Sequence, residues 1–163
     1  PLSSNLRQGW GPSPWNNMPI AYSILRDPEI LLVSYKGTVT NSDFLEGYKR
    51  AYLDPRYIPA MPEISDMRHM KVYDININAI QEMTAWLAGR DCLEGKTIQV
   101  GVLVSNTLHD GVSRLYRAVS DIYGKEELKP FSELRPALDW LPIDEARYSM
   151  VESELTKLAG ARG

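Results

Sequence analysis

Runs of strand-forming residues alternate with runs of helical periodicity along most of this chain, and the alternation limits the possible folds more than any other feature. The clearest case is the apolar run at residues 97–104, which is typical of a buried strand. Apolar residues at helical spacing follow it, at Val112, Leu115, Tyr116, Val119, Ile122 and Tyr123. Because strands that are joined through helices need crossover connections, the pattern favours parallel pairing and an α/β fold.

The first regular region predicts an antiparallel hairpin. Residues 20–24 alternate apolar with polar side chains, residues 26–29 suit a turn, and residues 30–35 are rich in strand formers, with Gly37 closing the second strand. Later strands are expected at 63–67, 97–104 and 128–131. We therefore predict a mixed four- or five-stranded sheet, mostly parallel with an antiparallel N-terminal hairpin, flanked by helices.

Each expected helix begins at a residue whose side chain can accept a hydrogen bond from the first turn. Thr40 and Asp43 have the spacing of a capping box, and Pro55 ends the helix that follows them. Gly89 suits the end of the next helix. The other expected caps are Asn76 or Asn78, Thr107 with Asp110, Ser132, and Asp144.

The chain divides into three parts by composition. Residues 1–19 are rich in Gly and Pro and predict a flexible tail or linker, whereas residues 20–141 carry the α/β pattern. Residues 142–163 form a C-terminal helical extension, in which the helix 144–159 has a narrow apolar stripe. Such a stripe serves either association, as in a homodimer, or packing within the chain.

Composition excludes several classes of function. A length of 163 residues suits one domain, and a net charge of −3 without a run of Lys or Arg disfavours nucleic acid as a partner. The longest apolar stretches are far shorter than the ~20 residues of a membrane-spanning helix. Cys92 is the only cysteine, which precludes an internal disulfide, and no leader precedes the domain. We therefore expect a cytoplasmic protein and assign Cys92 no role.

Several short segments between residues 20 and 141 follow a familiar order. They are residues 22–24, 27–28 and 33–40, then 66–68, 100–104 and 111–116, and finally 131–134 and 137–141. Together they resemble the STAS-like proteins, relatives of anti-sigma-factor antagonists, and in particular small bacterial members of that group. The resemblance implies the mixed α/β fold more than a function. Our leading expectation for function is a noncatalytic binding or regulatory module.

Regulatory members of that group carry a phosphorylatable Ser or Thr at the start of the helix after the central strand. The corresponding stretch here, residues 70–76, contains neither, and Tyr73 is a poor substitute for a Ser-directed kinase. The resemblance therefore does not extend to the phosphorylation switch.

Motifs of catalysis are missing from the sequence. There is no Gly-rich phosphate loop, dinucleotide fingerprint or nucleophile elbow, and we expect no cofactor. His69, His109 and Cys92 lack metal-ligand spacing, so we expect no metal. The alternative to a binding module is a small hydrolase or transferase that uses His69 or His109 in a crevice at the sheet edge.

Polar residues follow two of the expected parallel strands, where open α/β sheets commonly bind ligands. We predict that residues 68–74 and 105–110 are loops that form a crevice. A helix beginning near Thr107, together with Arg68, would favour an anionic or zwitterionic ligand there, and a protein partner is the other alternative. The candidate ligand-binding residues are Asp66, Arg68, His69, Ser105, Asn106, Thr107, His109 and Asp110. Asp66 and Arg68 could equally form a structural ion pair.

Overall fold

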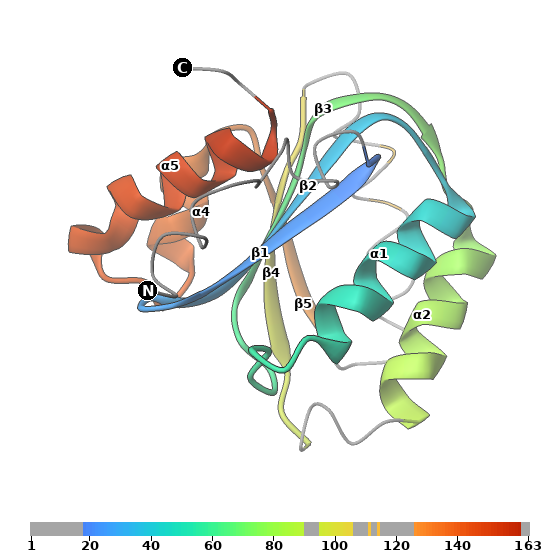
Figure 1. Ribbon diagram of the computed structural model, residues 1–163, viewed down its shortest axis with the longest axis horizontal. Helices are drawn as coiled ribbons and strands as arrows, with labels where there is room; N and C mark the ends of the chain where they lie inside the picture. The colour runs from blue at the N-terminus through green and yellow to red at the C-terminus, as the bar shows by residue number, and fades with distance from the viewer. Residues whose placement is uncertain (1–17, 90–94, 106–110, 112–113, 115–125, 161–163) are drawn as a thin grey trace, which may run out of the picture.

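The computed structural model describes residues 18–89, 95–105, 111, 114 and 126–160, which form one sheet with helices on both faces (Figure 1). The sheet of the described residues has five strands in the order β1-β2-β3-β4-β5. Their bounds are Ile20–Arg26 for β1, Glu29–Thr40 for β2, Glu63–Asp74 for β3, Ile98–Leu103 for β4 and Glu126–Phe131 for β5. The predicted fold class is therefore confirmed.

Strand pairing matches the predicted mixture of directions. β1 and β2 are antiparallel, with Tyr22 opposite Val33, and the pairs β2–β3, β3–β4 and β4–β5 are parallel. The N-terminal hairpin is thus the single antiparallel part of the described sheet. Val100, Val102 and Val104, expected among the most buried positions, expose at most 6% of their surface.

The segment 68–74 is a strand, and its prediction as a loop is wrong. β2 does not close at Gly37; it passes an irregularity there and continues to Thr40. This extension gives β3 a pairing partner beyond Asp66, and the two strands stay paired as far as Thr40 and Asp74. Backbone groups that would need water in a loop are bonded in the sheet instead.

The helices begin largely as the sequence predicts. Thr40 and Asp43 form the capping box of α1, and Asn76 Oδ1 accepts from the amide of Ala79 at the start of α2, at 3.1 Å. Asp144 caps the short turn η3 that precedes α5. Ser132 is not a cap, because α4 starts after Glu133, whose side chain makes no capping bond. The bounds are Asn41–Leu53 for α1, Ile77–Gly89 for α2, Leu134–Trp140 for α4, Glu145–Arg147 for η3 and Tyr148–Leu158 for α5.

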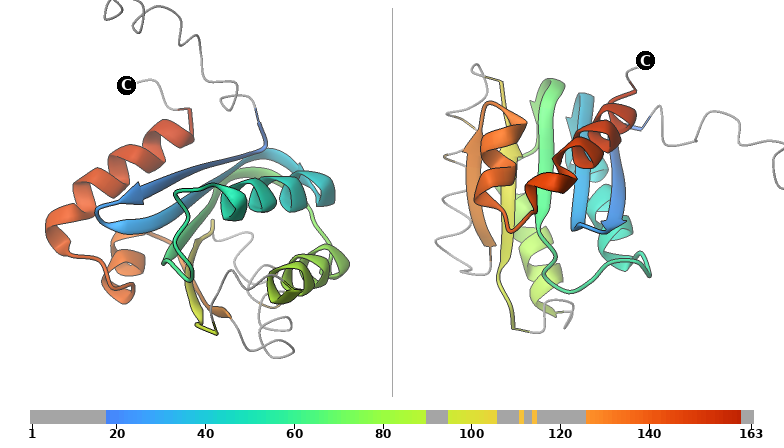
Figure 2. Two further views of the ribbon diagram at one scale, coloured as in Figure 1. Left: turned by 60° about the horizontal axis from the view of Figure 1, so that its bottom comes forward. Right: turned by 90° about the vertical axis from the view of Figure 1, so that its left-hand side faces the viewer.

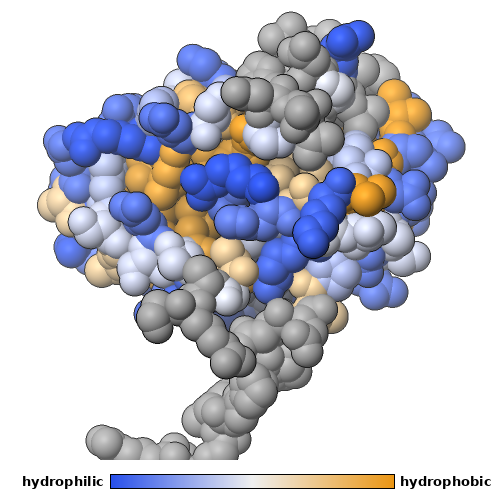
Figure 3. All heavy atoms as spheres, turned by 90° about the horizontal axis from the view of Figure 1, so that it is seen from above, coloured by the Kyte–Doolittle hydropathy of each residue, from blue (hydrophilic) through white to orange (hydrophobic). Residues whose placement is uncertain are grey.

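Each face of the sheet has its own core (Figure 2). α1 and α2 cover one face and bury residues such as Phe44, Tyr48 and Met83 against it. α4 and α5 cover the other face, where Leu138, Val151 and Leu155 are members of the second core. Seen from above, hydrophobic residues show between hydrophilic ones on the side of α5 (Figure 3).

The apolar stripe of the C-terminal helix is used within the chain. Val151 and Leu155 are 0% and 2% exposed, and they belong to the same core as Ile30 and Leu32 of β2. Burial of such side chains contributes about 1.5–3 kcal/mol each. Intramolecular packing thus accounts for the stripe, and a homodimer through this helix remains an untested prediction.

Some sequence predictions concern residues that the structure does not describe. The tail 1–17 and most of the helix predicted at 107–124 lie outside the described residues, as does Cys92. Among the described residues, no helix is long and apolar enough to cross a membrane.

A close contact between α1 and the hairpin, at Gly47 and Ile20, allows the packing of the helix to be tested. A Cβ added at Gly47 would lie 2.7 Å from Cγ2 and 3.0 Å from Cβ of Ile20, too close for either atom to remain in place. We expect Gly47→Ala to lower the free energy of unfolding by about 1–3 kcal/mol, measured by urea denaturation. Gly89→Ala, which meets nothing within 4 Å, is the control and should be near neutral. Equal stability of the two variants would contradict this packing.

Candidate functional site

Asp66 and Arg68, two of the predicted site residues, form an ion pair on β3. Arg68 Nε and Nη2 donate to the two carboxylate oxygens of Asp66, each at 2.9 Å, and its backbone amide donates to Oδ1 at 3.1 Å. Hydrogen bonding to Asp66 raises the pKa of Arg68 further. Asp66 is buried, with 1% of its side chain exposed, so the pair satisfies a carboxylate that would otherwise be buried without a partner.

The other predicted site residues are not gathered around this pair. His69 is exposed on β3 opposite Lys36, and its side chain makes no hydrogen bond within the described part of the chain. Ser105 is half-buried just after β4. Asn106, Thr107, His109 and Asp110 lie outside the described residues. Since residues 68–74 are a strand, the predicted crevice between two loops does not form as expected.

Arg68 instead lines a shallow groove beside α4 and α5. The groove has an empty volume of about 660 Å³, counting space open to solvent, and it carries both signs of charge. Arg135 pairs with Glu145 and lies over the ring of Tyr148, whose hydroxyl donates to Asp139 at 2.7 Å. The hydrogen bond to Asp139 raises the pKa of Tyr148 to about 12. Both arginines of the groove are thus already paired with carboxylates.

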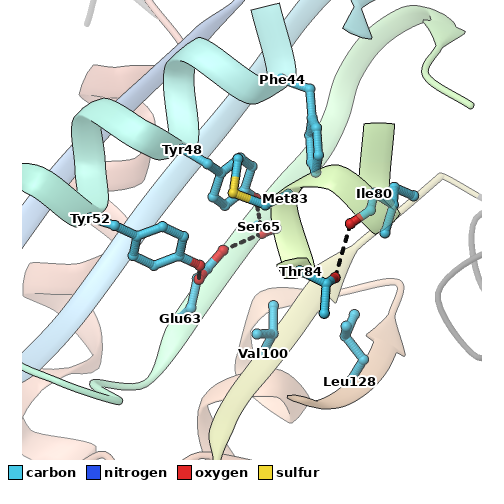
Figure 4. A pocket seen from close by; sticks show the side chains of 10 residues that line it. All are labelled: Phe44, Tyr48, Tyr52, Glu63, Ser65, Ile80, Met83, Thr84, Val100 and Leu128. Atoms are coloured by element: carbon cyan, nitrogen blue, oxygen red, sulfur yellow. Dashed lines mark hydrogen bonds between the residues drawn. The ribbon is translucent and has the colours of Figure 1, made fainter. Parts of the chain in front are cut away.

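A second cavity lies on the opposite face, between the sheet and the helices α1 and α2 (Figure 4). Its empty volume is about 370 Å³, counting the part open to solvent. The walls combine aromatic, aliphatic and thioether side chains with a few polar groups. The lining residues are Phe44, Tyr48, Tyr52, Glu63, Ser65, Ile80, Met83, Thr84, Val100 and Leu128. We call this the Glu63 pocket, because Glu63 is the one carboxylic acid among these described lining residues.

Sequence periodicity places the polar groups of the pocket. Tyr48 and Tyr52 are four residues apart on α1 and so share the face that α1 turns to the sheet. Glu63 and Ser65 are two residues apart on β3, which points both side chains to the same face. The described structure therefore brings two tyrosines of α1 over two polar residues of β3.

These side chains form a continuous chain of hydrogen bonds that ends at Glu63. Ser65 Oγ donates to Oε1 and Tyr52 Oη donates to Oε2, both at 2.9 Å. Tyr48 Oη lies 2.7 Å from Ser65 Oγ. Because the one proton of Ser65 goes to Glu63, Tyr48 must donate to Ser65, and it accepts in turn from Tyr35 Oη at 2.8 Å.

Glu63 is an unusual residue to find in a core. It is 2% exposed, and no Lys, Arg or His of the described residues forms an ion pair with it. Burial raises its pKa above the ordinary value of 4.5, and the hydrogen bonds from Ser65 and Tyr52 offset only part of the rise. A Glu63 protonated at Oε1 can donate to Ser65 if the bonds between Ser65, Tyr48 and Tyr35 reverse, while Tyr52 still donates to Oε2. The network therefore accommodates both protonation states.

Sequence reasoning missed this pocket, although its signal was present. The sequence patterns place Glu63 only at the start of a short strand, and they assign no role to the tyrosines of α1. Two polar residues at alternate positions of a strand, beside a helix with aromatic residues four apart, would have indicated a buried polar site. Among the described residues, no cluster of His, Cys, Asp and Glu could hold a metal ion.

Comparisons with known proteins concern the fold. No family model matches the chain, and no curated protein matches it. It is similar to the crystal structure of an uncharacterized protein of the DUF3478 family with a SpoIIAA-like fold, from Shewanella loihica PV-4. The two are 18% identical, with a TM-score of 0.49 over 75% of this chain and 91% of that one.

Removal of the buried charge tests the electrostatics of Glu63. Its raised pKa means that the folded chain binds the proton more tightly than the unfolded chain. The wild type therefore loses stability as pH rises from about 4.5 through the folded pKa, and Gln at this position does not titrate. We expect the stability of Glu63→Gln relative to the wild type to increase over that range, in denaturant titrations at a series of pH values.

The matched control is Glu46→Gln, which removes a carboxylate from the exposed side of α1. It accounts for the general effect of losing one negative charge. A stability difference between Glu63→Gln and wild type that falls with rising pH, after this correction, would refute the proposed effect of burial.

Proposed function

We propose that this chain is a noncatalytic binding module that takes a small ligand with an apolar body and one polar group into the Glu63 pocket. The observation that carries the proposal is a fully buried carboxyl group, oriented by Tyr52 and Ser65, in the wall of an otherwise mainly apolar cavity. Small-molecule sites commonly combine apolar walls with a few oriented polar groups.

The cost of burying Glu63 supports a role beyond packing. Glutamate is almost never fully buried unless it is paired, and burial of an unpaired charge costs much free energy. Here the carboxyl group of Glu63 accepts hydrogen bonds from Tyr52 of α1 and Ser65 of β3, and Tyr48, one turn earlier on α1, joins the network through Ser65. Such a pre-arranged group loses little freedom when a ligand binds, which favours affinity.

The groove beside Arg68 is the second candidate, in keeping with the anionic or zwitterionic ligand or protein partner that the sequence suggests. Arg68 and Arg135 supply cationic groups, while Glu133 and Glu152 supply anionic ones. Both arginines already bind carboxylates, Asp66 and Glu145, so a ligand must compete with these pairs. The groove is therefore less favourable than the Glu63 pocket.

The hydrolase alternative has less support from geometry. A catalytic histidine needs a hydrogen-bonded acid and a nearby nucleophile. His69 is exposed, and within the described part of the chain its side chain bonds to neither. His109 lies outside the described residues. Turnover of generic ester or phosphate substrates that disappears in His69→Ala or His109→Ala would favour the enzyme over the binding module.

Filling the pocket is the direct test of the binding proposal. Thr84 lines the pocket from α2, so the longer side chain of Thr84→Met should occupy ligand space, while Ala85→Met changes an exposed position of the same helix. We expect compounds from a small-molecule library to raise the melting temperature of the wild type and of Ala85→Met. At 100 times Kd, binding adds about 2.7 kcal/mol of stability.

The same compounds should leave Thr84→Met unchanged. Equal stabilisation of all three proteins would place binding elsewhere on the chain. A library of broad chemistry that stabilises none of them would count against the proposed function itself.

A further inference from the structure

Glu63 is the one carboxyl group among the described residues of the pocket lining. Its remaining ionisable neighbours are Tyr48 and Tyr52, whose hydroxyls already take part in the hydrogen-bond chain. No lysine, arginine or histidine belongs to the described lining. When Glu63 is ionised, the pocket therefore holds one buried anion without a cationic partner in the described structure, and a cationic ligand would favour that ionised form.

The directions of the hydrogen bonds also decide what the pocket can offer a ligand. With Glu63 ionised, Tyr52 and Ser65 give their protons to it, Tyr48 gives its proton to Ser65, and Thr84 gives its own to the carbonyl of Ile80 at 2.9 Å. These hydroxyl protons are all committed. The Glu63 oxygens, by contrast, each accept one hydrogen bond, from Tyr52 or Ser65, and retain a further lone pair. The pocket thus presents acceptors to a ligand.

We infer that the pocket ligand is a small organic amine, whose ammonium group binds Glu63 and whose apolar body packs between α1, α2 and the sheet. This inference rests on the proposed function and specifies its ligand class. An anionic ligand would meet a buried carboxylate without a free donor, while a neutral apolar ligand would leave that carboxylate unpaired in a dry site.

Aromatic side chains support the same class of ligand. Phe44, Tyr48 and Tyr52 follow one another along α1, with ring centroids 5.0 Å and 5.8 Å apart, and all three line the pocket. Aromatic faces attract ammonium groups, by roughly 2 kcal/mol or more when the site is dry. Met83, Val100 and Leu128 supply apolar walls for the rest of the ligand.

A metal cation fits less well than an organic one. Calcium takes 6–8 oxygen ligands, and magnesium needs a nearly ideal octahedron. The described pocket offers one carboxyl group, and no cluster of three potential ligands exists in the described part of the chain. An ammonium group needs only a few acceptors, which this pocket can supply.

Three probes of similar shape test the inference on the unmodified full chain. They are ethylamine, ethanol and acetate, which end in a cationic, a neutral and an anionic group and are small enough for a narrow pocket. Isothermal titration calorimetry gives affinity, and methyl NMR signals of Met83, Val100 and Leu128 report on the site. We expect the amine to bind about tenfold or more tightly than the alcohol, as a charge-assisted hydrogen bond implies, and the anion to bind least.

Glu63→Gln should remove most of the advantage of the amine, while binding of the alcohol changes little. Glu46→Gln is the control for the loss of a charge elsewhere on α1. The order of affinities of the three probes for the wild type tests the inference even if Glu63→Gln does not fold.

The outcomes separate the two levels of the proposal. Alcohol binding at least as tight as amine binding, with methyl shifts at the pocket, overturns the amine but leaves a ligand pocket in place. An amine that binds without affecting these methyl signals also overturns the inference. The proposed function fails separately, if no library compound binds in a way that Thr84→Met prevents.

Discussion

The hydrogen bonds that satisfy one buried carboxyl group, that of Glu63, determine how helix α1 packs on the sheet. A carboxyl group removed from water needs donors at both oxygens, and the chain supplies them from Tyr52 of α1 and Ser65 of β3. Tyr48 joins the same network through Ser65, and Tyr35 of β2 extends it. Helix α1 is therefore held over the sheet at two points, four residues apart, by polar contacts within an apolar core. Gly47, on the same helix, allows the close contact with Ile20 that this position requires.

The two faces of the sheet handle charge in different ways. On the face of α4 and α5, Asp66 is buried but bonded in two places to Arg68, which is partly exposed and keeps its charge in contact with water. On the other face, Glu63 has only hydroxyl partners among the described residues. The ion pair with Arg68 satisfies the carboxylate of Asp66 almost completely. The hydroxyls around Glu63 leave much of the negative charge of an ionised Glu63 uncompensated. This difference explains why the Glu63 pocket, rather than the more open Arg68 groove, is the stronger candidate for a ligand.

Local patterns predicted what depends on neighbouring residues in the sequence. The hairpin, the capping box at Thr40 and the buried strand containing Val102 follow from turn chemistry, cap spacing and apolar runs. Residues 68–74 were predicted as a loop because their strand character depends on a partner, the extension of β2 to Thr40, which no local pattern reveals. The site was missed for the same reason. Tyr52 and Glu63 have clear periodic positions, but their contact exists only once α1 crosses β3, and the predicted ligand residues were chosen from strand ends alone.

Glu63 connects packing, electrostatics and the proposed ligand, so its protonation is the property to measure directly. The pKa of Glu63 can be read from the side-chain carboxyl ¹³C chemical shift, followed by NMR as a function of pH in the ligand-free chain and assigned by comparison with Glu63→Gln. Burial without a cationic partner predicts a titration midpoint above the ordinary value of 4.5. A midpoint at or below 4.5 would mean that the carboxylate is already well compensated. In that case the pocket would have no electrostatic reason to bind a cation.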